Sequence, residues 1–479
     1  MGKTVTNFGH NLRFTPRHVF APRDEGELLR ILDEQRGCSI RVVGSKHAWS
    51  DGIITKGVLI DLGHLRQVET VQDSDGETWA TIGGGCQIKH ILTALYKQAN
   101  VTLPAIGLIA EQTIAGATAT GTHGSGRHSI SHYLAEVRVA TYDPQTGRAC
   151  IRTIVAGDEL RAARCSLGCL GIVVSVQLRC VVPYHITEVV VRCGAVAEAL
   201  AMEEESPLQQ FYLIPHSWQI FVQRRAVAPA GSSRSWHATF YRLYWRLGLD
   251  IAYHLAVIIL AAILRSGSAI QFFYRWLFPR LTITGWRVTD RSDKNLLMGH
   301  ELFRHLELEF FVPRRHVESA ATLVREIVDL FSGTTQDVSA GLREKLAEHG
   351  LLADLLQKKG TFTQHYVICV RKILPDDTLI SMASSDQEPW YSFSFVTYVE
   401  PRQPFYAMAE LLARCTLALY GGRLHWGKWF PLRHEEISET YPDLETFRRL
   451  ADKFDPRGVF RNDYTARVLG LTHRDDDTV

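Results

Sequence analysis

The sequence predicts an α+β fold built from two domains. At 479 residues the chain is too long for one ordinary hydrophobic core. From residue 12 to 183 it reads as short strands broken by turns, whereas from residue 184 longer strands are joined by two long amphipathic helices. Because strands and helices do not alternate regularly, an α+β fold is favoured over a doubly wound sheet.

The first domain, residues 12–183, should contain both strands and one clear helix. β-branched and apolar runs that end in turns predict strands at 39–44, 57–62 and 78–85. A helical period follows at 87–100. The run at 170–182 is nearly continuous in apolar residues, which is typical of a strand buried on both faces.

The second domain, residues 184–420, should be an antiparallel sheet covered by helices. The predicted strands are 305–313, 365–373 and 391–400, and the predicted covering helices are 318–331 and 404–422. The last of these helices should stop at its two glycines, Gly421 and Gly422. We expect the segment 421–479 to return to the first domain.

Composition excludes several classes of function. Lys and Arg number 53 against 51 Asp and Glu, which gives a formal charge of +2. A charge this small produces no electrostatic field strong enough to suggest a nucleic acid as a partner. The nine cysteines form no paired CxxC set, so we expect no disulfide framework and no metal site. The N-terminus lacks the apolar stretch of a secretory signal, which predicts a cytoplasmic protein.

An apolar insertion at about 235–280 separates the strands of the second domain. Residues 251–264 are a run of fourteen mostly apolar residues, which is shorter than the roughly 20 that span a bilayer. Aromatic residues and arginines, among them Arg246, Arg265 and Arg275, accompany this run. Two interpretations remain open: a peripheral membrane contact, with the protein attached at the interface, or a pair of buried helices that cap the domain.

Three glycine-rich segments, 42–51, 82–88 and 107–126, indicate a phosphate site. A diphosphate is held by many backbone N–H groups, and glycine lets the backbone come close to it. The segment 107–126 also carries threonine, serine and histidine donors. Neither GxGxxG nor GxxxxGK[ST] stands at a strand-to-helix junction. Spacing alone therefore predicts a nucleotide-type phosphate site and leaves the cofactor unnamed.

Five motifs in order resemble a known family. GSKHAWSD, then TIAGATATGTHGSG, then SLGCLGIVVSVQL are similar to the FAD-binding domain of the vanillyl-alcohol oxidase family. GGRLHWGK (421–428) and LADKFDPRGVFRNDY (450–464) resemble the C-terminal region of its aldonolactone oxidase branch, which includes L-gulonolactone, D-arabinonolactone and alditol oxidases. The resemblance covers the chain except 235–280. It implies a two-domain flavoprotein that oxidises a hydroxyl of a sugar-1,4-lactone or related sugar alcohol, with hydride transfer to flavin N5 and reoxidation by oxygen to hydrogen peroxide.

The resemblance also implies an FAD site in which His47 is bonded to the flavin 8α-methyl carbon. The alternative interpretation of His47 is a loop histidine that lies beside a non-covalently bound flavin. Lys46 and Ala48 depart from the glycine and serine usual in this loop. Gly107 lacks the methyl group that hinders oxygen in a plant dehydrogenase relative, so oxygen reactivity is expected. The assigned FAD residues are Val43, Gly44, Ser45, Lys46, His47, Gly107, Gly116, Ala117, Thr118, Gly121, Thr122, His123, Ser125, Ile172 and Val173.

Two cations are the predicted catalytic residues. Arg371 matches an arginine at the reacting centre of these oxidases, where its charge can stabilise the reduced flavin and orient a substrate oxygen. Lys428, in HWGK, matches a lysine that hydrogen-bonds the hydroxyl or the developing alkoxide. Strand alternation puts Cys369 on the same face as Arg371. His425 is either part of this site or a packed core histidine.

Three departures from the family pattern bear on the substrate. Cys369 stands where many of these oxidases have a glutamate, and Leu108 and Ser394 stand where alditol oxidases have serine and histidine. A linear polyol needs those hydrogen bonds, so a rigid lactone or a larger, less polar alcohol is favoured.

Two other functions remain open. The flavin can pass its electrons to a membrane carrier instead of oxygen, with 235–280 docking at the bilayer. Alternatively, the chain is a flavin-loaded interaction protein without catalysis, for which the missing acid at Cys369 is the only argument.

Overall fold

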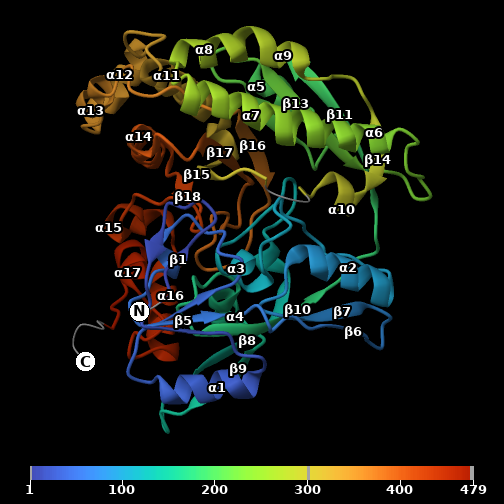
Figure 1. Ribbon diagram of the computed structural model, residues 1–479, viewed down its shortest axis with the longest axis vertical. Helices are drawn as coiled ribbons and strands as arrows, with labels where there is room; N and C mark the ends of the chain where they lie inside the picture. The colour runs from blue at the N-terminus through green and yellow to red at the C-terminus, as the bar shows by residue number, and fades with distance from the viewer. Residues whose placement is uncertain (1–2, 299–301, 475–479) are drawn as a thin grey trace.

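The structure, a computed structural model, describes residues 3–298 and 302–474. The glycine-rich segments belong to the lower part of the molecule in Figure 1, and a large sheet under long helices forms the upper part. Helices and sheets are mixed without regular alternation, and the α+β prediction is confirmed.

The lower part contains two sheets that position the loops of the predicted FAD site. A parallel sheet has the order β3 (His18–Phe20), β5 (Val58–Asp61), β4 (Ile40–Val43). An antiparallel sheet has the order β6 (Val68–Gln72), β7 (Thr78–Gly83), β10 (Ile172–Arg179), β8 (Leu134–Tyr142), β9 (Ala149–Ile154). The helices of this part are α1 (Glu25–Glu34), α2 (Ile88–Ala99), α3 (Ile114–Ala119) and α4 (Gly157–Arg164). Strand β10 is buried on both faces, as its apolar run predicted.

The upper part is an eight-stranded antiparallel sheet. Its order is β14 (Val288–Arg291), β11 (His185–Cys193), β13 (Ile220–Val227), β12 (Gln210–Leu213), β16 (Ile368–Ile373), β17 (Trp390–Tyr398), β15 (His305–Pro313), β18 (Arg423–Leu424). The predicted helices are α11 (Val317–Phe331) and α14 (Arg402–Tyr420), and both pack against β15. Helix α14 ends at Gly421, whose φ of +60° suits glycine.

The C-terminal segment lies against the loops of the lower part. It carries α15 (His434–Ile437), α16 (Leu444–Phe454) and α17 (Asp463–Leu469). The N–H of Ile40 in β4 donates to the carbonyl of Val459, and the N–H of Trp49 donates to the carbonyl of Gly427, both at 2.8 Å. These hydrogen bonds bring the HWGK motif beside the loop that carries His47.

The apolar insertion forms two helices on the outside of the eight-stranded sheet. One helix runs from Ala238 to Ile263 and includes α6 (Ala238–Tyr244) and α7 (His254–Ile258), and the next includes α8 (Gly267–Phe272) and α9 (Phe278–Leu281). Their inner sides form a second core with the sheet, built by Phe273 and Tyr274 against Val190, Ile214 and Phe221.

The first of these helices is longer than the fourteen-residue apolar run in the sequence, and it is more exposed than a buried cap helix would be. Among residues 3–298 and 302–474 it alone has the length and apolar composition to cross a bilayer, with 26 residues and a mean hydropathy of 1.8. Only 11% of its most apolar stretch is buried. The prediction of buried cap helices is therefore wrong for the outer side, because each helix meets the sheet with only one of its sides.

Candidate active site

A first cavity lies between the loop after β4, the start of α3 and the start of β10. Nine of the predicted FAD residues line it: Val43, Gly44, Ser45, Lys46, His47, Gly116, Ala117, Ile172 and Val173. Lining residues that sequence reasoning missed include Trp49, Gln112, Thr113, Thr120, Gly168 and Tyr464.

The walls of this cavity require glycine. A Cβ on Gly44 would lie 2.1 Å from Oγ1 of Thr113, so only glycine lets the two loops meet. Lys46 has a φ of +58°, a left-handed conformation that favours glycine, the residue that the family resemblance gave for this position. An ion pair of 3.1 Å between Lys46 and Asp61 accompanies this conformation. The loops therefore come together as a flavin-binding backbone requires, and these residues fit the FAD that the sequence implied.

His47 sits at the inner wall of the first cavity. Its side chain is only 9% exposed, and its ring stacks on Phe8 at a centroid distance of 4.9 Å. The Glu111 carboxylate lies 3.9 Å from Nε2 of this ring. The ring is thus held in one place beside the cavity.

Several predicted FAD residues lie elsewhere. Thr118 donates its hydroxyl hydrogen to the carbonyl of Ile114 at 2.9 Å, and Gly121 takes a turn with a φ of +71°. Ser125 donates to the carbonyl of Gln209, so it joins the lower part to the large sheet.

Gly107 lines neither large cavity. A Cβ on Gly107 would lie 2.8 Å from Cγ2 of Thr122, which fills the space that a methyl group would occupy. Close packing against Thr122 is one reason for a glycine at this position, and the expected oxygen reactivity stays a prediction.

A second cavity adjoins the first, because His425 and Lys428 line both. Thr122 and His123 also line this second cavity, as do all four predicted substrate-side residues, Leu108, Cys369, Ser394 and His425. Arg371 lies in its wall as well. The structure therefore brings Lys428 to the boundary between the two cavities and Arg371 to the wall of the second.

The polar end of the second cavity is one row of residues across the sheet. Pairing places Tyr212 opposite Cys369, Cys369 opposite Ser394, and Ser394 opposite Glu309. The N–H of His425 then donates to the carbonyl of Glu309 at 3.0 Å. Residues directly opposite in a sheet point to the same face, so the register sets this row.

Lys428 is held by an acidic residue that sequence reasoning missed. Its ammonium group forms an ion pair with Glu307, whose other oxygen accepts a 2.6 Å hydrogen bond from the Ser394 hydroxyl. The ammonium also lies 4.3 Å from the ring centroid of Trp49. All four side chains are buried, which holds the lysine at the boundary of the two cavities.

Arg371 remains charged in this wall. Burial by itself lowers the pKa of its guanidinium, but the thiolate that Cys369 forms at high pH and the Glu309 carboxylate outweigh burial and raise that pKa. Its Nε donates to Oε1 of Gln210 at 3.1 Å. Cys369 cannot supply the acid that relatives have there, because burial raises the pKa of its thiol and keeps it neutral.

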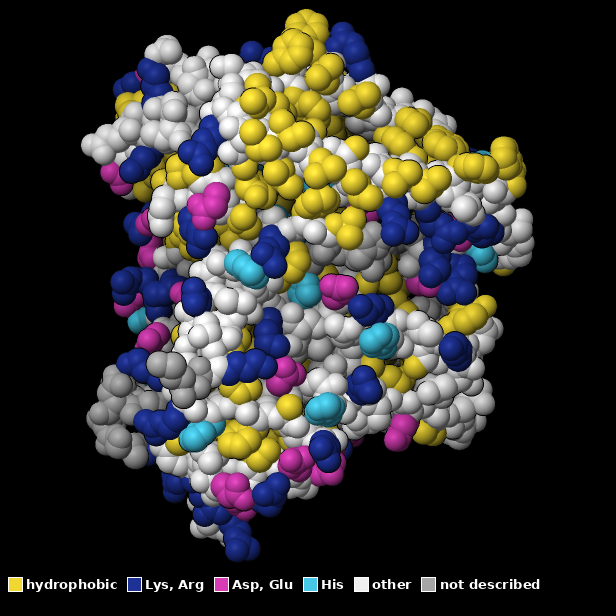
Figure 2. Space-filling view, in the orientation of Figure 1, with side chains coloured by type: hydrophobic (Ala, Val, Ile, Leu, Met, Phe, Trp, Pro, Cys, Tyr) yellow, Lys and Arg dark blue, Asp and Glu magenta, His cyan; other side chains and the backbone are white. Residues whose placement is uncertain are grey.

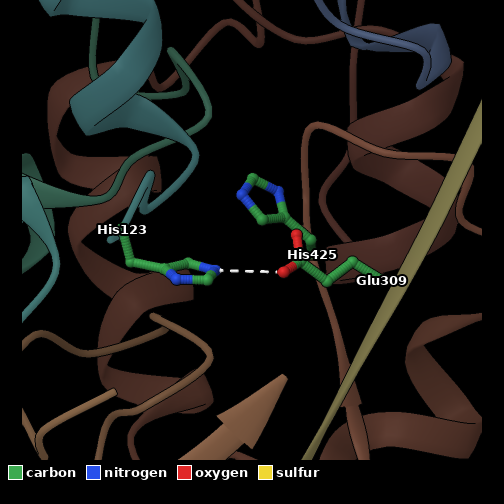
Figure 3. Close-up of side chains that lie close together, drawn as sticks. All are labelled: His123, Glu309 and His425. Carbon is green, nitrogen blue, oxygen red and sulfur yellow. Dashed lines mark ion pairs between the residues drawn. The ribbon is translucent and has the colours of Figure 1, made fainter. Parts of the chain in front are cut away.

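A carboxylate between two histidines lies on strand β15, two strands away from β16 in the sheet. Figure 3 shows the His123 ring directed at the carboxylate of Glu309, with the His425 ring close by. His123 Nε2 lies 3.4 Å from Glu309 Oε1. Burial raises the pKa of Glu309, but the His123 imidazole outweighs burial, and the pKa lies well below its usual range.

His425 is a neutral member of this cluster. Burial lowers its pKa to about 3. Its Nδ1 accepts a 3.0 Å hydrogen bond from the N–H of Gly427, so the ring proton is on Nε2. His425 can therefore donate a hydrogen bond within the site.

The same three side chains have the spacing of a metal site. His123, Glu309 and His425 each bring one ligand atom, all within 4.8 Å of one another. The positive charges of Lys428 and Arg371 act on the same carboxylate and oppose a further cation. The arrangement is better suited to a proton than to a metal ion.

The rest of the second cavity is mostly apolar, although Asp250, His254 and Thr282 also line it. Its sheet side is lined by Val190, Ile214, Phe221, Val367 and Val396, and its helix side by Tyr241, Tyr244, Trp245, Leu249, Tyr253, Phe278 and Ile283. The cavity thus joins a charged inner end to a long wall of aliphatic and aromatic side chains.

Sequence reasoning missed Glu307 and Glu309, although a signal was present. Both lie in the run HLELEFFVP at 305–313, where two acids alternate with leucines in an otherwise apolar strand. Two buried carboxylates on one face of a strand are costly unless they have partners. That cost indicates a functional face.

Comparison with known proteins agrees with the fold and the site. Residues 176–468 match the family described as D-arabinono-1,4-lactone oxidase, and residues 16–148 match the FAD binding domain. Cholesterol oxidase from B. sterolicum has the same fold, with a TM-score of 0.74 at 13% identity over 98% of this chain and 97% of that one.

Several relatives match nearly the whole chain. A long-chain alcohol oxidase from an uncultured marine euryarchaeote is 43% identical over 98% of this chain and 97% of its own length. L-gulono-1,4-lactone dehydrogenase from Mycobacterium tuberculosis is 25% identical over 95% and 96%. The fold and these matches define an FAD-dependent oxidoreductase that acts on CH–OH groups. The chain belongs to the D-arabinono-1,4-lactone oxidase family, the branch that its motifs predicted.

Proposed function

We propose that this chain oxidises the hydroxyl group of a long-chain alcohol, the class of substrate in the name of its 43% identical relative. The observation that carries the proposal is the second cavity, whose wall beyond the charged inner end is mostly apolar, with Asp250, His254 and Thr282 as polar members. A sugar lactone has polar groups along its whole length, and an apolar wall would leave many of them without hydrogen bonds. An alkyl chain matches that wall.

The inner end has the groups that the oxidation of a hydroxyl needs. We place the substrate oxygen between Arg371 and Lys428, whose charges stabilise the developing alkoxide. Bound FAD supplies the hydride acceptor. The Glu309 carboxylate, whose Oε1 lies 3.4 Å from Nε2 of His123, accepts the hydroxyl proton. Glu309 thus takes the place of the acid that is missing at Cys369, which argues against the interpretation as a protein without catalysis.

His47 is our proposed site of covalent flavin attachment. The support is its position in the wall of the first cavity, its stacking on Phe8 and the Glu111 carboxylate on the Nε2 side of its ring. A neutral imidazole nitrogen is a competent nucleophile toward the 8α carbon.

We propose oxygen as the electron acceptor, with hydrogen peroxide as the product. The 43% identical relative is named an oxidase, whereas the Mycobacterium tuberculosis relative is named a dehydrogenase. Peroxide formed in step with alcohol consumption would support oxygen. Turnover with an artificial dye but not with oxygen would indicate that a membrane electron carrier, and not oxygen, accepts the electrons.

A sugar-1,4-lactone is the second candidate substrate. It is favoured by the family match over 176–468 and by the charged inner end of the cavity. Primary alcohols of increasing length, D-arabinono-1,4-lactone and L-gulono-1,4-lactone, compared by kcat/KM with peroxide detection, distinguish the two. The proposal requires the long-chain alcohols to be the better substrates.

A further inference from the structure

The outer side of the two insertion helices is a continuous apolar surface. Figure 2 shows hydrophobic side chains gathered over α6–α9, with Lys and Arg side chains beside them. Trp236 is 83% exposed and Ile263 is 69% exposed. We define the apolar face by its exposed members: Trp236, Phe240, Leu243, Leu247, Leu255, Ile259, Ile263, Leu264, Phe272, Trp276, Leu277, Leu281 and Ile283. Exposed apolar patches of this extent mark interaction sites.

The charge around the apolar face selects its partner. Residues 234–289 carry seven arginines, and Asp250 is their single acidic residue. Arg246, Arg265, Arg275 and Arg280 are exposed. Arg280 lies over the ring of Trp276, 5.4 Å from its centroid. Apolar side chains bordered by tryptophan and arginine match an anionic lipid surface, where the rings reach headgroup depth and the guanidinium groups meet phosphates.

The same helices form the apolar wall of the second cavity. Tyr241, Trp245, Leu249 and Tyr253 follow one another at intervals of four and line the cavity, so they lie on one side of the helix. Leu243, Leu247 and Leu255 lie on the exposed side. One helix therefore separates the apolar face from the cavity, and the exposed Ile283 belongs to both.

We infer that the apolar face docks on an anionic membrane and that alcohols enter the second cavity directly from the bilayer. The helices lie along the surface rather than across the bilayer, because the inner sides of both pack on the eight-stranded sheet. The hydroxyl of Tyr253 also hydrogen-bonds that of Tyr274 at 2.7 Å, which ties the first helix to the second. The inference deepens the proposed function, since alcohols with long alkyl chains partition into membranes.

Vesicle sedimentation tests the docking separately from catalysis. The FAD-loaded full chain should sediment with phosphatidylcholine vesicles that contain phosphatidylglycerol, and more weakly with phosphatidylcholine alone. Leu247→Glu/Ile259→Glu/Ile263→Glu should lower vesicle affinity at least tenfold. Val71→Glu, an exposed valine on β6, is the matched control and should bind as the unaltered chain does. Arg246→Glu/Arg280→Glu should remove the preference for anionic vesicles.

Rates of decanol oxidation then distinguish entry of the alcohol from the bilayer from docking of the protein on the membrane. With decanol in detergent, the triple variant should keep its activity and its bound flavin, since the three altered residues lie outside the cavity wall. With decanol held in vesicles, its rate should fall about as far as its affinity does. Equal vesicle binding by the triple variant and the unaltered chain would overturn the inference. So would self-association without vesicles that the triple variant abolishes, because the apolar face would then cover a second copy. Vesicle binding without oxidation of any alcohol would leave the docking intact and reject the proposed function.

Discussion

Glu309 Oε1 lies 3.4 Å from Nε2 of His123. In the large sheet, Glu309 belongs to the same row of paired residues as Cys369, whose strand is two strands away. In the proposed function, Glu309 on β15 takes the place of the acid that the family resemblance implied at Cys369 on β16. Because the sheet register brings Cys369, Ser394 and Glu309 onto one face, the carboxylate stays at the polar end of the cavity.

Replacing Glu309 should remove the proton acceptor. Glu309→Gln keeps the shape of the side chain and should lower kcat/KM by roughly 10²–10⁴-fold. Cys369→Ser in the same row is the control and should change kcat/KM by only a few-fold. Steady-state rates with decanol, together with the absorbance of bound flavin, provide the measurement. Full activity of Glu309→Gln with flavin bound would reject the proposed role.

The length of the alcohol should control the rate. Each methylene buried is worth about 0.8 kcal/mol, so kcat/KM should rise about fourfold per methylene until the apolar wall is covered. Leu249→Trp narrows the cavity at its helix side and should move the optimum to shorter alcohols. Leu247→Trp, two residues away on the exposed side, should leave the optimum unchanged. Rates that are independent of chain length would contradict this account.

His47 should hold the flavin through a covalent bond. On a denaturing gel in acid, flavin fluorescence should stay with the chain and should be lost in His47→Ala. The exposed His64→Ala is the matched control and should keep it. Flavin that washes out of the unaltered chain would reject the bond while leaving the FAD site in place.

Buried histidines should make the fold sensitive to mild acid. Burial lowers the pKa of His365 to about 4 and that of His216 to about 4, from 6.5. Between these values the unfolded chain binds more protons, so the free energy of unfolding is highest above about pH 6.5 and falls toward pH 4.

At about 1.4 kcal/mol per pKa unit, His365 alone accounts for a loss of up to roughly 3 kcal/mol. His365→Gln should therefore flatten the decline of the urea midpoint between pH 7 and 4.5. The exposed His349→Gln should not change it. Parallel declines in all three proteins would contradict the assignment.

Most of the fold could be predicted because local patterns decide it. Alternation and apolar runs located β10 and β15, and two glycines marked the end of α14. The loops with His47 and Gly116 were found because close backbone packing needs small residues. Such requirements are local, so they are visible in the order of residues.

The remaining features depend on contacts between distant segments. Glu309 is 186 positions from His123 in the chain, and strand register brings them together. Gly107 was assigned to oxygen access, but its packing against Thr122 is a tertiary contact. The exposed side of the insertion could not be predicted from composition, because an apolar helix has the same sequence pattern whether protein or lipid covers it.

Reduction of the bound flavin without oxygen tests the central claim most directly. The purified chain is mixed anaerobically with decanol, or with L-gulono-1,4-lactone at equal concentration, and the flavin absorbance near 450 nm is followed. The account predicts rapid bleaching by decanol and slow or no bleaching by the lactone. Bleaching by the lactone with none by the alcohol would contradict the account and would identify a sugar lactone as the substrate.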